Sequence, residues 1–326
     1  MPSHITSCKL NASETAICGG IAGITTRFAI SPLDVIKIRL QVQSTRSQNI
    51  KYNGISQTFK TIVQEEGIRG LFKGNVAAEY LYLTYGISQF YAYYHVDQFI
   101  DKKMQVIPSL KPFVSGMIAG SFATTVTYPF DLLRTRFALQ GTNKVYNSLS
   151  HAVLDIVEKE GIGGFYRGLG SSITQIMPYM GLMFFSYEGL CSFAQRLKEK
   201  RMVSDKQSRI TDMICGSLAG IISKAGVFPL DVIRKRLQVQ GPHISEYAVS
   251  SIPTYYQGSV LKCLTRTVQT EGICALYKGL LPGLLKAGPS GAVYFLVFEF
   301  SKDCMTSMKE NGYRLLSNNT LLSAST

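Results

Sequence analysis

Long apolar stretches alternate with short amphipathic stretches along the chain. Six of the apolar stretches are long enough to cross a bilayer as helices, and we expect them at residues 13–42, 75–100, 110–138, 169–197, 209–239 and 280–306. Amphipathic stretches with helical periodicity separate the members of each pair, at residues 54–66, 148–160 and 258–271. The pattern predicts an all-α membrane protein with six transmembrane helices and three short amphipathic helices.

A proline followed by an acid and two bases closes the first long stretch of each pair. The three copies are Pro32-Leu-Asp34-Val-Ile-Lys37-Ile-Arg39, Pro129-Phe-Asp131-Leu-Leu-Arg134-Thr-Arg136 and Pro229-Leu-Asp231-Val-Ile-Arg234-Lys-Arg236. Their prolines are 97 and 100 residues apart, so the chain is an internal triplication. Proline and opposite charges are costly at membrane depth, so three copies in phase indicate a functional device.

A second motif follows each amphipathic stretch. Its copies run from Glu66-Gly67 to Lys73-Gly74, from Glu160-Gly161 to Arg167-Gly168 and from Glu271-Gly272 to Lys278-Gly279, with an aromatic residue before each final base. Each repeat also begins with a Gly-x-x-x-Gly motif, a spacing that lets helices approach closely in lipid. We therefore expect repeats at 12–106, 107–204 and 205–310, followed by a disordered tail at 311–326 that is rich in Ser, Asn and Thr.

Composition fits spans that have one lipid-facing side and one wet side. Hydrophobic residues make up 46% of the 326 residues. The mean hydropathy is only +0.10, which is low for a chain buried in lipid on all sides. The net charge of +13 is compatible with nucleic-acid binding or with a basic surface on anionic lipid. Because no Lys/Arg run is interleaved with aromatic residues and the bases recur with the repeats, we favour anionic lipid together with an anionic solute.

The sequence offers no chemistry typical of an enzyme. The seven cysteines contain no Cys-x-x-Cys pair, the four histidines form no cluster, and no Ser/His/Asp or phosphate-loop pattern occurs. We expect neither a metal nor a cofactor. The N-terminus has neither the apolar core of a secretory signal nor an Arg-rich presequence, so any organelle address must be internal.

The two motifs, repeated in phase three times, closely resemble the mitochondrial carrier family of inner-membrane solute transporters. The resemblance covers nearly the whole chain apart from its ends. It implies a pseudo-threefold fold with alternating access, residence in the mitochondrial inner membrane and a monomeric state. Because the number of spans is even, both termini are expected on the same side, the intermembrane space, and the amphipathic helices in the matrix.

The acid and the first base of each proline motif lie on one helical face, three residues apart. If the prolines bend these helices toward a common axis, each acid meets the base of the next repeat. The expected pairs are Asp34 with Arg134, Asp131 with Arg234, and Asp231 with Lys37. Such a ring closes the matrix side in the family, and Gln41 and Gln238 are placed to brace it, whereas repeat two has Ala138 there. The alternative is that each acid pairs only with the base of its own helix.

A second closure is expected at the opposite mouth. The family's aromatic-acid-x-x-base pattern is present as Tyr187-Glu188 with Cys191 in the base position, and as Phe298-Glu299 with Lys302. The second span departs from it, with Tyr94 and Asp97. We therefore expect one outer ion pair, Glu188 with Lys302, with Glu299 beside it, and an outer gate weaker than the matrix ring.

The glycines of the second motif open helices whose N-terminal amides can bind an anion. Together with Gly54 and Gly258, which begin two of the amphipathic stretches, the motif glycines Gly74, Gly168 and Gly279 resemble the cardiolipin sites of the family. The alternative is that these are ordinary helix-start glycines beside interfacial bases.

Helical phase, counted from the motif acids, places Arg27 and Lys224 on a wet face. The resemblance to the family adds Gln175 and Lys286, which stand at its contact positions, and the second span offers Glu79 and Gln89 near the corresponding place. Three bases on separate helices suit a diphosphate. Glu79 faces either Lys286 or a cationic part of the cargo.

The stretch from Gly74 to Phe90, with Leu-Tyr-x-Thr-Tyr-Gly-x-x-Gln-Phe, resembles a fungal branch of the family that transports thiamine pyrophosphate. That resemblance implies this cargo, exchanged for nucleotides or thiamine monophosphate. The alternatives are a carrier of adenine nucleotide or coenzyme A, and a basic membrane scaffold without transport.

Overall fold

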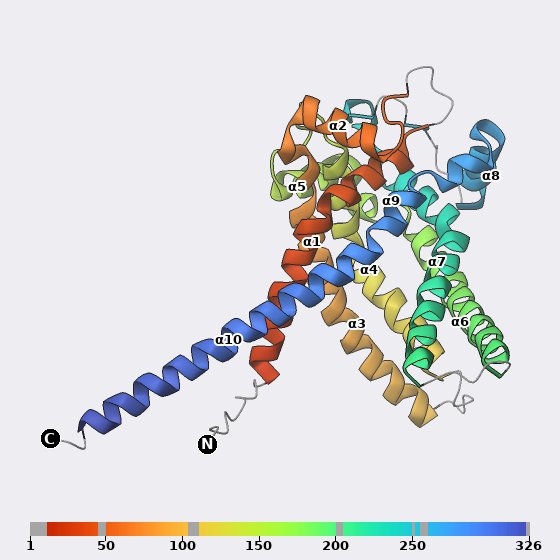
Figure 1. The fold of residues 1–326 in the computed structure, drawn as a ribbon. Helices are drawn as coiled ribbons and strands as arrows, with labels where there is room; N and C mark the ends of the chain where they lie inside the picture. Colours follow the sequence, from red (N-terminus) through yellow and green to blue (C-terminus); the bar gives the residue numbers. More distant parts are fainter. Residues whose placement is uncertain are drawn as a thin grey trace. The chain divides into compact units, whose positions relative to one another are not determined.

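The computed structural model describes residues 12–44, 50–103, 111–199, 205–249, 252–254 and 260–323, and every regular element in them is a helix (Figure 1). The chain divides into two compact units. Unit 1 comprises Met1–Ser31 and Leu285–Thr326, and unit 2 comprises Pro32–Leu284. We describe each unit by itself.

Five of the six predicted spans are single long helices. They are α1 (Ala12–Val42), α3 (Asn75–Lys103), α4 (Lys111–Leu139), α6 (Leu169–Glu199) and α7 (Asp205–Gln238). The sixth is interrupted at Lys286 and forms α9 (Leu280–Leu285) and α10 (Ala287–Ser323). Pro289 explains the break, because its ring lacks an N–H and collides with the carbonyl of the residue four positions earlier.

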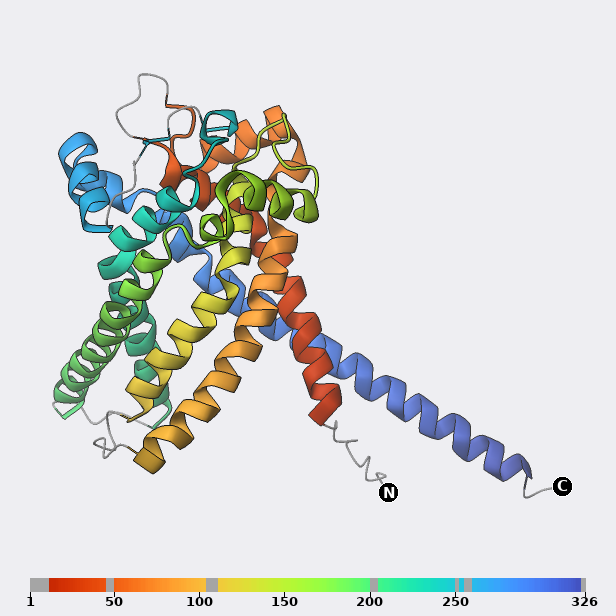
Figure 2. The same cartoon turned by 180° about the vertical axis from the view of Figure 1, so that it is seen from behind.

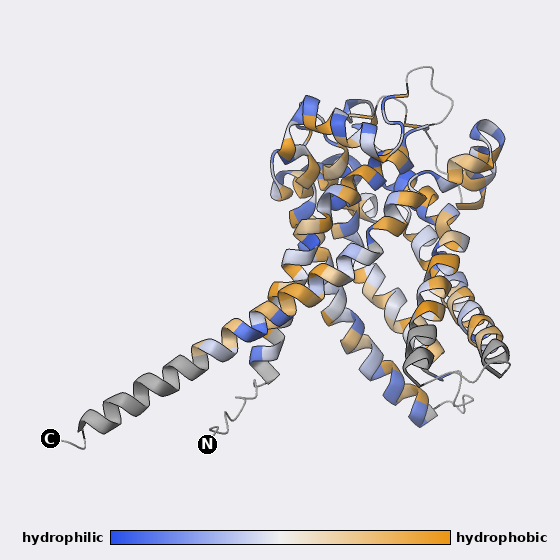
Figure 3. Cartoon of the chain, viewed as in Figure 1, coloured by the Kyte–Doolittle hydropathy of each residue, from blue (hydrophilic) through white to orange (hydrophobic). Residues whose placement is uncertain are grey.

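Two described segments are long and apolar enough to span a membrane on composition alone, Ile214–Gln238 and Ile273–Met308. Within unit 2, α3 packs along α4 and α6 packs along α7 (Figures 1 and 2). Hydropathy colouring shows much of the coloured part of α7 orange, whereas blue positions are frequent on the short helices at the top of the view (Figure 3). The long helices therefore present apolar surface, and charge concentrates where they end.

The three amphipathic stretches form α2 (Ile55–Glu66), α5 (Leu149–Glu160) and α8 (Val260–Glu271), as predicted. Each of these helices buries two residues that are one helical turn apart, for example Thr58 and Ile62 in α2. A glycine ends each helix, and the second motif continues as the 3₁₀ helices η1 (Ile68–Phe72), η2 (Ile162–Tyr166) and η4 (Ile273–Tyr277). A further 3₁₀ turn, η3 (Ile244–Glu246), follows α7.

The main core of unit 2 joins α1, α2, the end of α4 and the segment after α7. Its buried members include Ile36, Ile62, Leu139 and Val239. This core fixes the ends of α1, α4 and α7 relative to one another, which positions the charged residues of the proline motifs.

In unit 1, the first half of α1 and α10 approach at Gly19, where an added Cβ would lie 3.7 Å from the Tyr294 hydroxyl. That distance is an ordinary van der Waals contact, and nothing lies within 4 Å of a Cβ added at Gly23, so the packing described here does not require glycine at either position of this Gly-x-x-x-Gly pair. The helix α10 continues to Ser323 through most of the segment for which composition predicts disorder. Extending an existing helix avoids the cost of nucleation, and no proline stops it.

Candidate functional site

Three ion pairs join the ends of α1, α4 and α7 in unit 2. Arg134 Nη2 lies 2.6 Å from Asp34 Oδ2, Arg234 Nη2 lies 2.9 Å from Asp131 Oδ2, and Lys37 Nζ lies 2.8 Å from Asp231 Oδ2. Each pair links two different helices in the order that the sequence predicts, and not an acid with the base of its own helix. We call these six residues the ion-pair ring.

The ion-pair ring is largely withdrawn from solvent. The three aspartates are 5–7% exposed. An exposed pair contributes under about 1 kcal/mol, whereas removing one partner of a buried pair costs roughly 3–5 kcal/mol. The ring therefore holds the three helix ends firmly.

Both predicted glutamine braces contact the ring. Gln41 Nε2 is 3.5 Å from Asp231 Oδ2, and Gln238 Nε2 donates to Asp131 Oδ2. Gln238 Oε1 also accepts from Thr135 at 2.8 Å. The link between α4 and α7 is thus braced more tightly than the link between α7 and α1.

Two lysines outside the predicted ring also contact its acids. Lys235 Nζ lies 3.0 Å from both Asp131 oxygens, and Lys224 Nζ lies 3.3 Å from Asp231 Oδ2. Lys235 directly follows the ring base Arg234, so the signal was available in the motif itself. Lys224, which is also predicted to bind substrate, contacts the ring through Asp231.

Next to the ion-pair ring, toward the carboxyl ends of α1, α4 and α7, the last arginine of each proline motif pairs with the glutamate of the second motif. These pairs are Arg39 with Glu66, Arg136 with Glu160 and Arg236 with Glu271. All six side chains are at most 2% exposed. Sequence reasoning identified both motifs but not that they meet.

Each of these arginines also reaches the next repeat. Arg39 Nε donates to the Ala138 carbonyl at 3.0 Å, and Arg136 Nε donates to the Gln238 carbonyl at 3.1 Å. Arg236 Nε donates to the Gln41 carbonyl at 3.1 Å and closes the cycle. The unpaired carbonyls at the ends of three helices thereby gain charged donors.

Glu66 and Asp155 lie outside the long helices and have lowered pKa values. Burial alone would raise the pKa of Glu66, but hydrogen bonds and charge from Arg39 and Lys73 outweigh it. Burial likewise opposes the shift of Asp155, whose pKa is lowered by hydrogen bonds from Lys159 and His243. Both carboxylates are therefore held in the ionised form.

The glycines that end the second motif pack against the ring bases. Gly74 has φ +84°, and an added Cβ would lie 2.6 Å from the Arg134 carbonyl oxygen. The same test places Gly168 against the Arg234 carbonyl at 3.2 Å and Gly279 against the Lys37 carbonyl at 3.1 Å. Close approach to the ring helices is thus one reason for glycine here.

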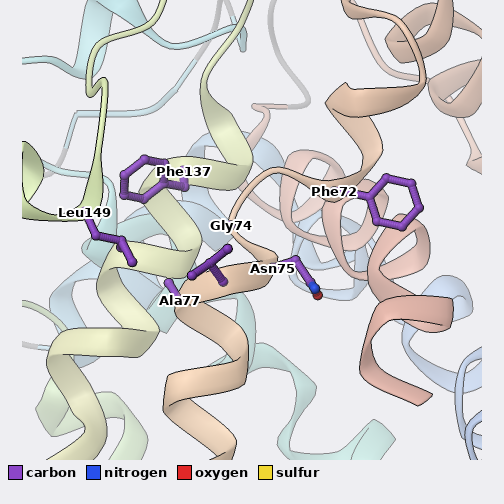
Figure 4. Close-up of a pocket in the computed structure, with 7 residues that line it drawn as sticks. Phe72, Gly74, Asn75, Ala77, Phe137 and Leu149 are labelled. Carbon is purple, nitrogen blue, oxygen red and sulfur yellow. The ribbon is translucent and has the colours of Figure 1, made fainter. Parts of the chain in front are cut away.

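A cavity of about 300 Å³ adjoins Gly74 at the start of α3 (Figure 4). Apolar side chains from three parts of unit 2 line it, including Phe72, Phe137 and Leu149. Among the other glycines predicted to bind cardiolipin, Gly54 also has positive φ, at +80°, and Gly258 lies outside the described residues.

The candidate substrate residues divide between the units. Glu79, Gln89, Gln175 and Lys224 belong to unit 2, whereas Arg27 and Lys286 belong to unit 1, so their convergence stays a prediction. All six are partly buried. Gln175 Oε1 is buried without a hydrogen-bond partner in the described part of the chain, as suits a group that awaits a ligand.

The residues predicted to form the outer gate belong to different units: Glu188 to unit 2, and Glu299 and Lys302 to unit 1. Lys302 Nζ lies 3.7 Å from Glu299 of its own helix, and Glu188 is exposed on α6. The pair of Glu188 with Lys302 would join the two units, and it stays a prediction. Asp97, which departs from the family pattern, pairs with Lys111 at 3.1 Å.

Three repeats, each with a proline-containing helix that adds an acid and a base to one ring, define a solute carrier of the six-helix class. The chain belongs to the mitochondrial carrier protein family, whose sequence profile matches residues 9–104, 105–198 and 205–309. This is a family of transporters.

Several curated relatives match most of the chain. The "Mitochondrial thiamine pyrophosphate carrier 1" of Aspergillus oryzae is 46% identical over 299 residues, which cover 88% of this chain and 92% of the relative. The protein of the same name from Phaeosphaeria nodorum is 43% identical over 315 residues, 92% of this chain and 95% of the relative. The one from Neurospora crassa is 41% identical over 306 residues, 88% of this chain and 90% of the relative.

Proposed function

We propose that this protein transports thiamine pyrophosphate across the mitochondrial inner membrane; the printed names of its relatives describe them as mitochondrial thiamine pyrophosphate carriers. The observation that carries the proposal is identity of 41–46% over most of both chains with carriers of that name. The inter-helix ring of unit 2 fits a transporter, because it can close one end of a pathway reversibly.

The chemistry of the cargo suits the candidate residues. Thiamine pyrophosphate has a diphosphate, which Arg27, Lys224 and Lys286 would bind as charge-assisted donors. Its thiazolium ring is permanently cationic and matches the acid Glu79, with Gln89 and Gln175 as neutral partners. An aromatic contact to that ring would add about 0.5–2 kcal/mol.

Cargo binding would open the ring by differential affinity. A ligand shifts a conformational equilibrium only by binding one state more tightly than the other. Lys224 offers a route, because a diphosphate that attracts it draws a cation away from Asp231. Glu188, Glu299 and Lys302 would form the opposite gate, with transport running by exchange for nucleotides or thiamine monophosphate.

Three further properties belong to the proposal. Both termini lie on the intermembrane-space side, the carrier works as a monomer, and cardiolipin binds at the glycine-initiated helices. The apolar cavity beside Gly74 supports the last point, because it provides a surface for an acyl chain next to helix N-terminal amides.

Reconstitution tests the cargo directly. Liposomes preloaded with thiamine pyrophosphate, thiamine monophosphate, ATP or coenzyme A are assayed for uptake of each of these solutes in labelled form. The proposal expects uptake that depends on an exchangeable internal solute, and Glu79→Gln should weaken uptake of the thiamine compounds more than uptake of ATP. Exchange of ATP or coenzyme A alone would establish the alternative cargo, and no exchange of any solute would favour a scaffold.

A further inference from the structure

Each cation of the ion-pair ring lies over an aromatic ring. The Arg234 guanidinium is 5.6 Å from the centroid of Tyr128, and Lys37 Nζ is 5.5 Å from that of Phe228. The Arg134 guanidinium is 5.5 Å from the centroid of Tyr82. Distances under about 6 Å permit a cation–π attraction.

Two of these aromatic residues occupy equivalent positions. Tyr128 and Phe228 directly precede the prolines and lie three residues before Asp131 and Asp231. One helix face thus presents a ring and a carboxylate to the same cation of the next repeat. Each of these two aromatic side chains also stacks on a tyrosine from the second motif of its own repeat. Tyr128 stacks on Tyr166 at 6.3 Å, and Phe228 stacks on Tyr277 at 6.5 Å.

Repeat one lacks this aromatic residue, because Ser31 precedes Pro32. The ring beside Arg134 comes instead from Tyr82, on α3 of the same repeat. Its hydroxyl also accepts a hydrogen bond from Arg134 Nη1 at 3.0 Å. Asp34 and Tyr82 therefore do together what Asp131 and Tyr128 do from a single helix.

We propose that Tyr82 is a positioning residue of the ion-pair ring, which replaces the missing aromatic residue of repeat one and holds Arg134 in place for Asp34. Each repeat then supplies one acid and one aromatic ring to the cation of the next. The aromatic face and the neutral hydroxyl of Tyr82 give the Arg134 guanidinium two further contacts without adding a second negative charge. The inference rests on the proposed closing role of the ring and is independent of the cargo.

A double-mutant cycle tests the inference without any substrate. The unfolding midpoint of purified protein in detergent is measured for Tyr82→Leu, Arg134→Gln and the double variant. Tyr82→Leu should lower the midpoint in the native background and lower it little further once Arg134 is replaced. Tyr93→Leu, at an exposed tyrosine on the same helix away from the ring contacts described above, is the matched control. Equal losses from Tyr82→Leu in both backgrounds would overturn the proposal.

Transport separates positioning from cargo contact. Tyr82→Leu should raise exchange-independent efflux from loaded liposomes by roughly 2- to 30-fold, the range a cation–π contact spans, with KM unchanged. Tyr82→Phe keeps the ring and should raise efflux less, which guards against a folding defect. A raised KM with unchanged efflux would make Tyr82 a substrate residue and sink the proposal. If the wild type exchanges none of the tested solutes, the proposed function fails while the stability cycle still decides the role of Tyr82.

Discussion

At the scale of single residues, Gly74 combines a conformation and a neighbour that both exclude a side chain. Its φ is +84°, a region that costs other residues roughly 1–2 kcal/mol, and an added Cβ would meet the Arg134 carbonyl at 2.6 Å. Because that neighbour is the backbone of the ring helix α4, it cannot move without disturbing Arg134.

Gly74→Ala should therefore destabilise the protein by at least about 2 kcal/mol. The unfolding midpoint in detergent measures this, and Gly86→Ala in the same helix is the control, since nothing lies within 4 Å of its added Cβ. Equal midpoints for the two variants would show that the contact between α3 and α4 is looser than described.

Glu66 should make stability depend on pH in the acid range. Its pKa is lowered from 4.5 in the folded protein, so the folded state favours the ionised form. The stabilisation is complete above that unfolded value and is lost as pH falls through the lower folded pKa. The unfolding midpoint should accordingly be flat near neutrality and fall below about pH 4.5.

The matched variant for this prediction is Glu66→Gln, which cannot titrate. It should start from a lower midpoint and show a shallower acid slope than the wild type. Identical slopes would assign the acid sensitivity to other carboxylates, such as Asp155.

At the scale of elements, the link between α4 and α7 is the most heavily charged of the three. Asp131 faces both Arg234 and Lys235, whereas the position of Lys235 is Ile38 in repeat one and Thr135 in repeat two. Lys235→Thr leaves the acid one cation, but Asp131→Asn leaves the buried Lys235 and the partly buried Arg234 without the acid that they share. The first should cost roughly 1–2 kcal/mol and the second roughly 3–5 kcal/mol, measured as unfolding free energies in detergent. The opposite order would mean that Lys235 stabilises this link mainly through Thr135 and Gln238 and not through Asp131.

The inter-helix pairs of the ring could be predicted because the triplication fixes equivalent positions and each motif contains its own acid and base. The Arg–Glu pairs below the ring were missed although both partners are motif residues. The two partners of each pair lie 24 to 35 residues apart in the sequence. They meet only because α2, α5 and α8 pack against the ends of the long helices. The hydrophobic periodicity of the sequence does not predict this packing.

Departures from the threefold pattern were the least predictable features. Tyr82 replaces an aromatic residue that repeat one lacks, but it does so from a different helix, so no alignment of the repeats reveals it. The break at Lys286 follows from Pro289, a local cause that the span length concealed. Local chemistry thus explains each exception once the helices are placed.

At the scale of the whole molecule, the contacts of unit 2 run in one direction. Repeat one gives Asp34 to repeat two, repeat two gives Asp131 to repeat three, and repeat three gives Asp231 back to repeat one. The arginine–carbonyl contacts below follow the same cycle. A cyclic closure is complete only when all its links are made, so breaking one link should weaken the seal as a whole.

Charge reversal of one link tests this closure. Asp34→Arg places a cation beside Arg134, and Arg134→Asp places an acid beside Asp34, so either change alone should raise exchange-independent efflux and depress exchange. The double variant restores opposite charges across α1 and α4 and should recover part of the tight exchange, although Tyr82 would then face an acid. Asp131→Asn in that background should abolish the recovery, because the second link of the cycle is lost. Single variants that leak no more than the wild type would show that the pair is not part of the seal, and a double variant as leaky as either single variant would show that the two charges do not act as an interchangeable pair.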